Sequence, residues 1–368
     1  MQAVILAGGE GTRLRPLTSS VPKPVVRLVD RPFMSFMLEW LRGHGVEDVI
    51  LSCGFMADAV RGVLGDGAQL GIRLRYVEEP EPRGTGGALK LAEPMLDERF
   101  LMLNGDVLTD IDLGAQLAQH ERTGARATLS LVAVPDPSAY GLVVLAEDRS
   151  VRDFVEKPGA PAGSPQANLI SAGAYVLERE ILDLIAPGRK VSIEGEVWPL
   201  LVGAGLYGFP SESYWLDIGT PARYLQGTFD ILEGNVQTAV RARLGEDWLA
   251  VGEGAEVRGR LIPPALLGAH TRIAATARVG GLVVLGERVE VGRGSTVERS
   301  VILDGARIGE GCELRDCIVA PGASVGDRTK LTGGAVIGEG VRIGADNVIT
   351  RGARIFPGAN LPDRAIEF

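Results

Sequence analysis

The chain has 368 residues, which exceeds one ordinary domain and makes two domains the starting expectation. A hydrophobic content of 45% and a charged content of 23% are usual for a globular protein and exclude a disordered chain. The formal net charge of -9 argues against a nucleic-acid-binding surface, which needs basic stripes. Three cysteines and three histidines form no disulfide framework, CxxC pair or cluster, so we expect a reducing compartment and no structural zinc.

The N-terminal sequence MQAVILAGG carries no basic leader, and its apolar run is too short for a signal peptide. The sequence has no stretch of 18 or more apolar residues, so we expect no membrane span. These features predict a cytoplasmic protein whose partners include neither a membrane nor a nucleic acid.

Strand-like and helix-like patterns alternate from the N-terminus to about residue 230. Such alternation favours a mostly parallel sheet covered by helices. We expect strands at Ala3–Ala7, Val49–Ser52, Arg73–Val77 and Phe100–Leu103, and helices at Pro32–Arg42 and Met56–Leu64.

From about residue 250, aliphatic residues recur every six positions and glycine often follows them. A period of six fits a hexapeptide β-helix, in which each face of a triangular prism takes six residues and the aliphatic residue points inward. Two steps of five, from Val297 to Ile302 and from Leu314 to Val319, predict turns that lose a residue. The runs are Val279, Leu285, Val291, Val297; Ile302, Ile308, Leu314; and Val319, Val325, Leu331, Ile337, Ile343, Ile349, Ile355, Leu361.

Segment 228–250 has the pattern of a connecting helix followed by a linker. No Pro/Ser-rich hinge separates the two halves of the chain. We therefore expect a first domain over 1–230, a connection over 231–250 and a β-helix domain over 251–368.

A glycine-rich turn follows the first expected strand, within LAGGEGTRLRPLTSSVPK (6–23). Glycines let backbone N–H groups approach an anion with no Cβ in the way. Arg13 adds a planar fork of donors and Lys23 a point charge, so the segment predicts a cradle for a triphosphate. It has neither the GK[ST] of a Walker A loop nor the third glycine of a dinucleotide-binding fingerprint.

The segment 8–24 resembles the GGxGTRLxPLTxxxPKP motif of the sugar-1-phosphate nucleotidyltransferases, also called nucleotide-sugar pyrophosphorylases. Further motifs of that family follow in order: GTGG (84–87), NGD (104–106), EKP (156–158), AGAY (172–175) and WLDIGTP (215–221). The β-helical tail extends the resemblance to the mannose-1-phosphate guanylyltransferase-like members. The resemblance implies a Rossmann-like, mostly parallel α/β nucleotidyltransferase domain followed by a left-handed parallel β-helix.

The resemblance also implies a reaction, in which an NTP and a sugar 1-phosphate give an NDP-sugar and pyrophosphate. Direct attack of the sugar phosphate on the α-phosphorus needs no protein nucleophile, so catalysis depends on positioning and charge neutralisation. The family match makes Arg13 a phosphate clamp and places Lys23 between the α-phosphate and the sugar phosphate. It makes Asp106 and Asp217, which end apolar approaches, the ligands of Mg²⁺.

Binding residues follow from the same motifs. Ser171 departs from the family pattern, because related guanylyltransferase-like sequences usually have Asn there. The expected nucleotide-binding residues are Leu6, Ala7, Gly8, Gly9, Gly11, Thr12, Glu79, Gly84 and Thr85, and the expected sugar-phosphate-binding residues are Gly141, Glu156, Lys157, Ser171, Gly173 and Glu194.

The base is predicted from Glu79, in VEEPEPRGTGG (77–87), where thymidylyl and uridylyl relatives have Gln. Guanine presents N1–H and N2–H₂ as adjacent donors, and a carboxylate can accept both. The carbonyl oxygens of a pyrimidine base would instead repel that carboxylate. We therefore expect GTP, with mannose 1-phosphate as the sugar; Glu81 takes this role if the register differs by two. The alternative is a glucose-1-phosphate uridylyltransferase or thymidylyltransferase.

Two other classes stay open. A non-catalytic regulatory homologue shares the two-domain plan, although intact Arg13, Lys23, Asp106 and Asp217 favour the enzyme. A bifunctional acyltransferase needs a histidine base in the β-helix, where only His270 is available. Regular coils with open edges favour self-association, so we expect a homo-oligomer, a dimer or tetramer.

Overall fold

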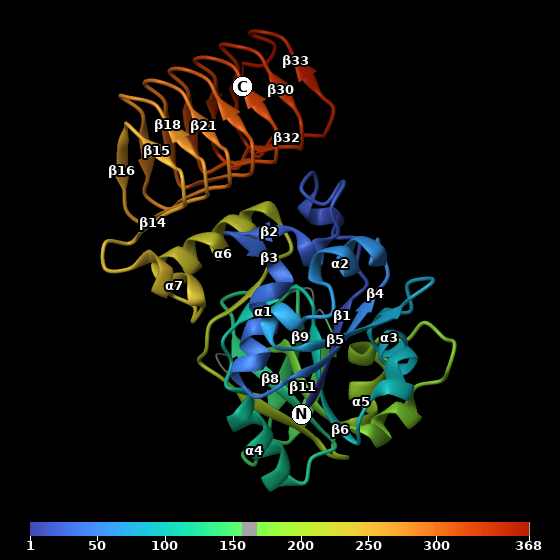
Figure 1. Ribbon diagram of the computed structural model, residues 1–368. Helices are drawn as coiled ribbons and strands as arrows, with labels where there is room; N and C mark the ends of the chain where they lie inside the picture. The colour runs from blue at the N-terminus through green and yellow to red at the C-terminus, as the bar shows by residue number, and fades with distance from the viewer. Residues whose placement is uncertain (157–167, 368) are drawn as a thin grey trace. The chain divides into compact units, whose positions relative to one another are not determined.

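The computed structural model describes residues 1–156 and 168–367 and divides the chain into two compact units (Figure 1). The first unit is Met1–Glu10, Lys23–Val25 and Met34–Asp217, and the second is Gly11–Pro22, Val26–Phe33 and Ile218–Phe368. Within the described part of the chain, every helix is too short or too polar to traverse a lipid bilayer.

The first unit is built on one mixed sheet, with the order β10-β9-β11-β6-β1-β4-β5, in which β8 also pairs with β11 and β12 pairs with β8. The sheet is parallel from β5 through β4 and β1 to β6, as expected, whereas β11 runs antiparallel to β6. The strands are β1 (Gln2–Ala7), β4 (Asp48–Cys53), β5 (Arg73–Glu78), β6 (Arg99–Asn104), β8 (Ala127–Ala133), β9 (Gly141–Leu145), β10 (Val151–Glu156), β11 (Leu169–Glu178) and β12 (Leu206–Pro210).

Helices and a small second sheet complete this unit. The four strands and two helices expected from the sequence are all present, with ends shifted by one residue or less. The helices are α1 (Phe33–Gly43), α2 (Ala57–Leu64), α3 (Gly84–Ala92), α4 (Leu113–Thr123) and α5 (Trp198–Leu201), and the small sheet pairs β7 (Val107–Thr109) with β13 (Trp215–Asp217).

Alternation along the strands gives the sheet an apolar core on each face. On β8, Leu131 joins the core under α3 and α5, while the next residue, Val132, packs on the opposite face near Trp40 and Trp215. Because successive side chains of a strand point to opposite faces, a strand covered on both sides is apolar throughout. Such a sheet holds the ends of its strands, and the residues that follow them, in fixed positions.

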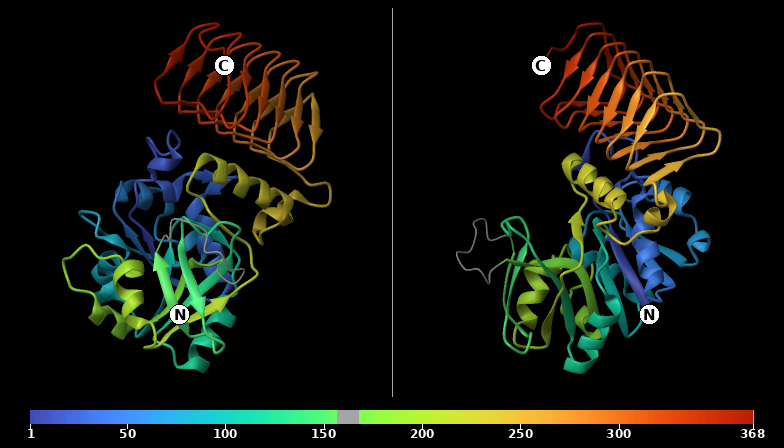
Figure 2. Two further views of the ribbon diagram at one scale, coloured as in Figure 1. Left: turned by 180° about the vertical axis from the view of Figure 1, so that it is seen from behind. Right: turned by 90° about the vertical axis from the view of Figure 1, so that its left-hand side faces the viewer.

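The second unit contains a left-handed parallel β-helix of three sheets, whose coils stack in a regular series (Figure 2). Nearly all of the predicted six-residue positions are buried in its core, and Ile355 and Leu361 in the last coils are partly buried. The first sheet is β14 (Leu249–Val251), β17 (Ala265–Leu267), β20 (Val283–Leu285), β23 (Ser300–Ile302), β26 (Ile318–Val319), β29 (Val336–Ile337) and β32 (Arg354–Ile355). The second is β15 (Glu256–Val257), β18 (Arg272–Ile273), β21 (Glu290–Val291), β24 (Arg307–Ile308), β27 (Ser324–Val325), β30 (Arg342–Ile343) and β33 (Asn360–Leu361). The third is β16 (Arg260–Ile262), β19 (Arg278–Gly280), β22 (Thr296–Glu298), β25 (Glu313–Arg315), β28 (Lys330–Leu331) and β31 (Val348–Ile349).

The two shortened coils lose their residue at one corner, as the sequence predicts. Ala265 pairs with Val283, 18 residues further on, whereas Val283 pairs with Ser300 after 17. At the shortened corner, Arg299 and Asp316 have φ angles of 46° and 49°, and the Arg299 guanidinium donates to the Asp316 carboxylate at 2.8 Å. A single left-handed residue therefore makes the turn in each of these coils.

Two helices precede the β-helix in the chain, α6 (Pro221–Glu233) and α7 (Ala239–Leu244). Thr220 caps α6 by accepting from the backbone N–H of Arg223 at 3.3 Å, and Gly234 ends the helix in the left-handed conformation. Segment 228–250 thus contains the end of α6, all of α7 and the start of β14. The unit also includes the hairpin of β2 (Arg27–Leu28) and β3 (Arg31–Pro32).

Candidate active site

The candidate site of the first unit lies where its four parallel strands end. Leu6 and Ala7 are the last residues of β1, and Gly8 and Gly9 follow them. The Leu6 carbonyl accepts from the Gly105 N–H at 2.9 Å, which joins the end of β1 to the turn after β6. Carboxyl ends of parallel strands are where open α/β sheets bind ligands.

Lys23 and Asp106 form an ion pair at this edge. The Lys23 ammonium lies 2.9 Å from Asp106 Oδ2, and its side chain is only 11% exposed, compared with 38% for Asp106. Asp106 lies between β6 and β7, and Lys23 begins a short 3-10 helix (Lys23–Val25). A nearly buried cation thus contacts a carboxylate that is open to solvent, an arrangement that phosphate oxygens could enter.

Asp217 is brought beside Asp106 by the small sheet. It ends β13 and stands opposite Val107, the residue after Asp106, in the antiparallel pairing of β13 with β7. The Tyr140 hydroxyl donates to Asp217 Oδ1 at 2.9 Å and orients the carboxylate. The two acids that are far apart in the sequence therefore lie in neighbouring positions of the structure.

This pair of carboxylates fits a hard divalent cation. Such a cation takes oxygen ligands, and Mg²⁺ is usually held by one or two carboxylates while water and substrate phosphates complete its coordination. Within residues 1–156 and 168–367, no group of three or more His, Cys, Asp or Glu side chains is gathered as a metal site. Asp106 and Asp217 are thus the pair of carboxylates at this edge whose oxygens match the donors that such a cation takes.

Glu79 lies at the end of β5 and faces the turn after β1. Its carboxylate accepts from the Ser52 hydroxyl at 3.0 Å. A Cβ placed on Gly8 would come within 2.7 Å of Glu79 Oε1, so the carboxylate lies directly against the Gly8 backbone. Glu81 is exposed and lies 3.9 Å from the Arg83 guanidinium, away from this contact, so Glu79 is the acid placed at the strand ends.

Gly84 and Thr85 open α3 and contact the segment that carries Glu194. The Thr85 hydroxyl donates to Glu194 Oε2 at 2.6 Å, and the Ser192 hydroxyl donates to the same oxygen at 3.0 Å. Glu194 is therefore half-buried and fixed rather than a free surface acid. A Cβ on Gly84 would lie 2.5 Å from the Val191 carbonyl oxygen.

The expected sugar-side residues lie on β9, β10 and β11. Gly141 pairs with Glu156 across β9 and β10, and Lys157 lies outside the described residues. Ser171 shares a hydrogen bond of 2.9 Å with the Tyr175 hydroxyl. The pairing of β11 with β8 is irregular between these two residues, and Gly173 has a φ of 75° there.

Gly11, Thr12 and Arg13 belong to the second unit. Gly11 is left-handed, with φ 65° and ψ 30°, and begins the 3-10 turn Thr12–Leu14. The Arg13 side chain is exposed, and the carbonyls of Arg13 and Arg15 each accept from the Arg354 guanidinium at 3.0 Å. The Gly11 carbonyl accepts from the Thr18 hydroxyl at 2.8 Å, so this turn is ordered through its backbone.

Three contributors escaped the sequence reasoning. Asn104 ends β6, and its Oδ1 is buried with no hydrogen-bond partner among the described residues. A Cβ on Gly173 would lie 2.9 Å from Asn104 Nδ2, so glycine admits this side chain. Asn104 was noted as part of NGD but given no role, whereas the hydroxyls of Tyr140 and Ser52 act through contacts that spacing does not reveal.

The described part of the site contains no activated thiol. Burial, reinforced by the charge of Glu79, raises the pKa of the Cys53 thiol to about 12. Cys53 therefore stays protonated near neutral pH and is a poor nucleophile. Strand-end carboxylates, a lysine and glycine-rich turns define an α/β protein built to bind phosphates rather than one that forms a covalent intermediate through this cysteine.

Comparisons with known proteins agree with that class. The family model described as "Nucleotidyl transferase" matches residues 2–234, and the model "GMPPB C-terminal domain" matches residues 261–366. The chain belongs to the nucleotidyl transferase family, and within it to the sugar-1-phosphate nucleotidyltransferases.

Relatives span the whole chain. A mannose-1-phosphate guanylyltransferase of Mycobacterium tuberculosis is 39% identical over 100% of this chain and 98% of its own length. The mannose-1-phosphate guanylyltransferase catalytic subunit beta of Danio rerio is 34% identical over 100% and 99%. A UTP–glucose-1-phosphate uridylyltransferase of Synechocystis is 31% identical over 87% of each chain.

A solved structure resembles part of the chain. The crystal structure of HddC from Yersinia pseudotuberculosis complexed with GMP-PN has a TM-score of 0.53 and 31% identity. It covers 61% of this chain and 96% of its own.

Proposed function

We propose that this protein transfers GMP from GTP to mannose 1-phosphate, giving GDP-mannose and pyrophosphate. The observation that carries the reaction class is the juxtaposition of Asp106, paired with Lys23, and Asp217, held by Tyr140. The full-length relatives named as mannose-1-phosphate guanylyltransferases support the choice of substrates. We also propose that the catalytic domain is residues 1–230, the connection 231–250 and the β-helix domain 251–368.

The reaction forms one bond and breaks one. An oxygen of the sugar phosphate attacks the α-phosphorus in line, and the bond from the α-phosphorus to the bridging oxygen of pyrophosphate breaks. Lys23 neutralises charge between the two phosphates, and Arg13 clamps the β- and γ-phosphates. No proton has to be moved by the protein, so positioning and charge neutralisation supply the catalysis.

Asp106 and Asp217 would hold Mg²⁺. When bound, the ion neutralises and orients phosphate oxygens during the transfer. Lys23 contacts Asp106 at 2.9 Å, and the Tyr140 hydroxyl donates to Asp217 at 2.9 Å, so each carboxylate is held by a neighbouring side chain.

The remaining roles divide between nucleotide and sugar. Leu6, Ala7, Gly8, Gly9, Gly11 and Thr12 line the nucleotide with backbone groups, while Gly84 and Thr85 open the helix beside it. Glu79, held by Ser52, accepts the N1–H and N2–H₂ donors of guanine. The sugar phosphate is bound by residues of the β9–β11 region and the segment before α5: Gly141, Glu156, Lys157, Ser171, Gly173 and Glu194.

UTP with glucose 1-phosphate is a second candidate substrate pair, because the Synechocystis relative is named a UTP–glucose-1-phosphate uridylyltransferase. We propose further that the protein works in the cytoplasm, as a homo-oligomer, with no membrane or nucleic acid among its partners.

A substrate matrix tests the proposal. The four ribonucleotides and dTTP are each combined with several sugar 1-phosphates and Mg²⁺, and released pyrophosphate is measured. The highest kcat/KM is expected for GTP with mannose 1-phosphate. A higher value for UTP or dTTP with glucose 1-phosphate would reassign the substrates, and no release with any pair would favour a regulatory homologue.

A further inference from the structure

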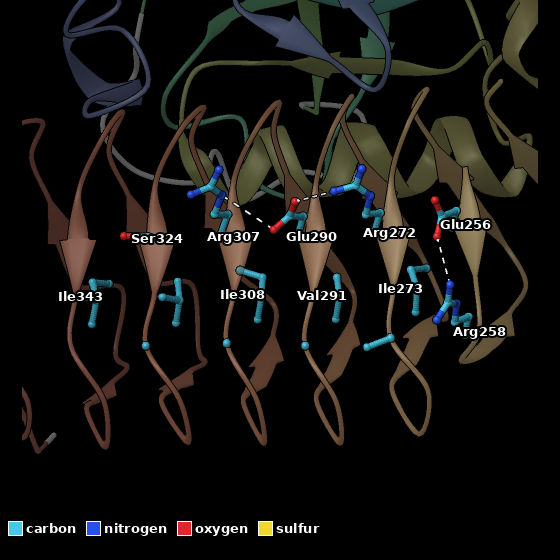
Figure 3. Close-up of a pocket in the computed structure, with 15 residues that line it drawn as sticks. Glu256, Arg258, Arg272, Ile273, Glu290, Val291, Arg307, Ile308, Ser324 and Ile343 are labelled. Carbon is cyan, nitrogen blue, oxygen red and sulfur yellow. Dashed lines mark hydrogen bonds and ion pairs between the residues drawn. The ribbon is translucent and has the colours of Figure 1, made fainter. Parts of the chain in front are cut away.

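One face of the β-helix carries a groove of about 610 Å³ beside a row of charges (Figure 3). The face is the second sheet, whose strands are each two residues long. The first residues of neighbouring strands lie side by side and form a row. In chain order that row is Glu256, Arg272, Glu290, Arg307, Ser324, Arg342, Asn360.

The charged side chains of the row point outward and stay accessible. Arg272 is 64% exposed and Arg307 is 74% exposed, and both pair with Glu290 between them, at 3.2 and 3.8 Å. The next residues along the strands, such as Val291 and Ile308, point into the core. The residues after those are small, Gly292 and Gly309 among them, and they line the groove together with the aliphatic residues that precede them.

We propose that this face docks against the same face of a second copy of the chain, with the two β-helices antiparallel. A two-fold axis would lie in the interface, parallel to the strands and between β21 and β24. This orders the partners as follows: Glu290 faces Arg307, Glu256 faces Arg342, and Arg272 faces Ser324. The inference deepens the homo-oligomer of the proposed function by assigning its surface and register.

Charge complementarity selects this register over its neighbours. An axis through β21 would set Glu290 against itself, and an axis through β24 would set Arg307 against itself. An axis between β18 and β21 would overlap only four of the seven strands, and an axis between β24 and β27 would set Arg307 against Ser324 and Arg272 against Asn360. The chosen register overlaps six of the seven strands, about 24 Å of sheet, and repeats each attractive pair through the symmetry. Small residues along the groove let the two sheets approach closely.

A charge-swap series tests the interface, with mass measured by light scattering at micromolar concentration and low salt. We expect the wild type to be at least a dimer. R307E should raise the dissociation constant of the dimer by at least about tenfold, because two attractive pairs become repulsive. The double variant E290R/R307E should restore dimerisation, which misfolding cannot explain. R315E, on the third sheet, is the matched control and should leave the dimer intact.

Disulfide cross-linking tests the register separately. In R272C/S324C the two cysteines are three strand spacings apart in one chain, about 14 Å, so they cannot pair within it. Under oxidation, this variant should give a disulfide-linked dimer, and R272C/R315C should not. A monomeric wild type would overturn the proposal. An oligomer in which R272C/S324C fails to cross-link would reject this face, and pyrophosphate release would still judge the proposed reaction independently.

Discussion

Lys23 reaches across 83 positions of sequence to contact Asp106, with its ammonium 2.9 Å from the carboxylate Oδ2. The contact joins a cation from the segment after the glycine-rich turn to the acid at the end of β6. The ion pair therefore holds both groups together at the strand-end edge of the sheet.

Asp106→Asn should lower kcat/KM by at least about 10²-fold, because it removes one of two anionic ligands while keeping the shape of the side chain. The melting temperature should fall modestly, because the nearly buried Lys23 loses its counter-charge while Asn keeps a hydrogen-bond acceptor. Asp112→Ala is the contrasting variant. Asp112 caps α4 by accepting from the Ala115 N–H, so its loss should cost about 1 kcal/mol of stability and leave kcat/KM intact. Full activity of Asp106→Asn would exclude the metal role.

Tyr140→Phe should raise the Mg²⁺ concentration needed for half-maximal rate by roughly tenfold. The change removes only the hydroxyl that orients Asp217. Titration of the initial rate with Mg²⁺ at saturating substrates measures it. Tyr207→Phe, on β12, controls for the loss of a hydroxyl. An unchanged requirement in Tyr140→Phe would show that Asp217 needs no such support.

Glu79→Gln should lower kcat/KM for GTP by roughly tenfold and change kcat/KM for UTP much less, because the amide repels one guanine donor and suits uracil. The comparison uses one sugar 1-phosphate throughout. Glu81→Gln, at an exposed position, should affect neither. Equal losses for the two nucleotides would mean that Glu79 does not contact the base.

Gly173→Ala should destabilise the protein by at least about 1–2 kcal/mol, since its φ of 75° disfavours a Cβ and that Cβ would lie 2.9 Å from Asn104. Gly43→Ala is the control, because nothing lies within 4 Å of the added Cβ there. Chemical denaturation measures both. A Gly173→Ala protein as stable as the wild type would show that β11 can shift at its irregular stretch.

We expect the folded protein to lose stability below about pH 6.5 because of the buried His120. Burial lowers the pKa of its imidazole below the usual 6.5, and the hydrogen bond to Glu178 only partly opposes this. The unfolded chain therefore binds a proton at His120 more readily than the folded chain does. The stabilisation of the fold by neutral His120 is complete above pH 6.5 and declines as the pH falls below that value. Melting temperatures between pH 8 and 5 should fall less steeply in His120→Gln than in the wild type or in His270→Gln. Parallel curves would assign the decline to other groups.

Local pattern was sufficient to predict the parallel strands, two helices and the inward coil positions from Val279 onward, but not those of the first coils, such as Leu267 and Ile273. The six-residue period depends only on which residues point inward, so it is visible in the sequence. The antiparallel placement of β11 was not, because strand direction beyond β6 depends on tertiary contacts. Likewise, Asp106 and Asp217 were selected by motif, but the Tyr140 hydroxyl on Asp217 and the Ser52 hydroxyl on Glu79 come from distant segments. Side-chain contacts of that kind leave no periodic trace.

The corner at Arg299 and Asp316 has a consequence for chain-length variation. A coil there closes with one residue fewer, and the inward and outward positions of the next strand are unchanged. The loss of one residue is therefore absorbed at that edge of the prism, so two coils of different length present the same inward and outward faces.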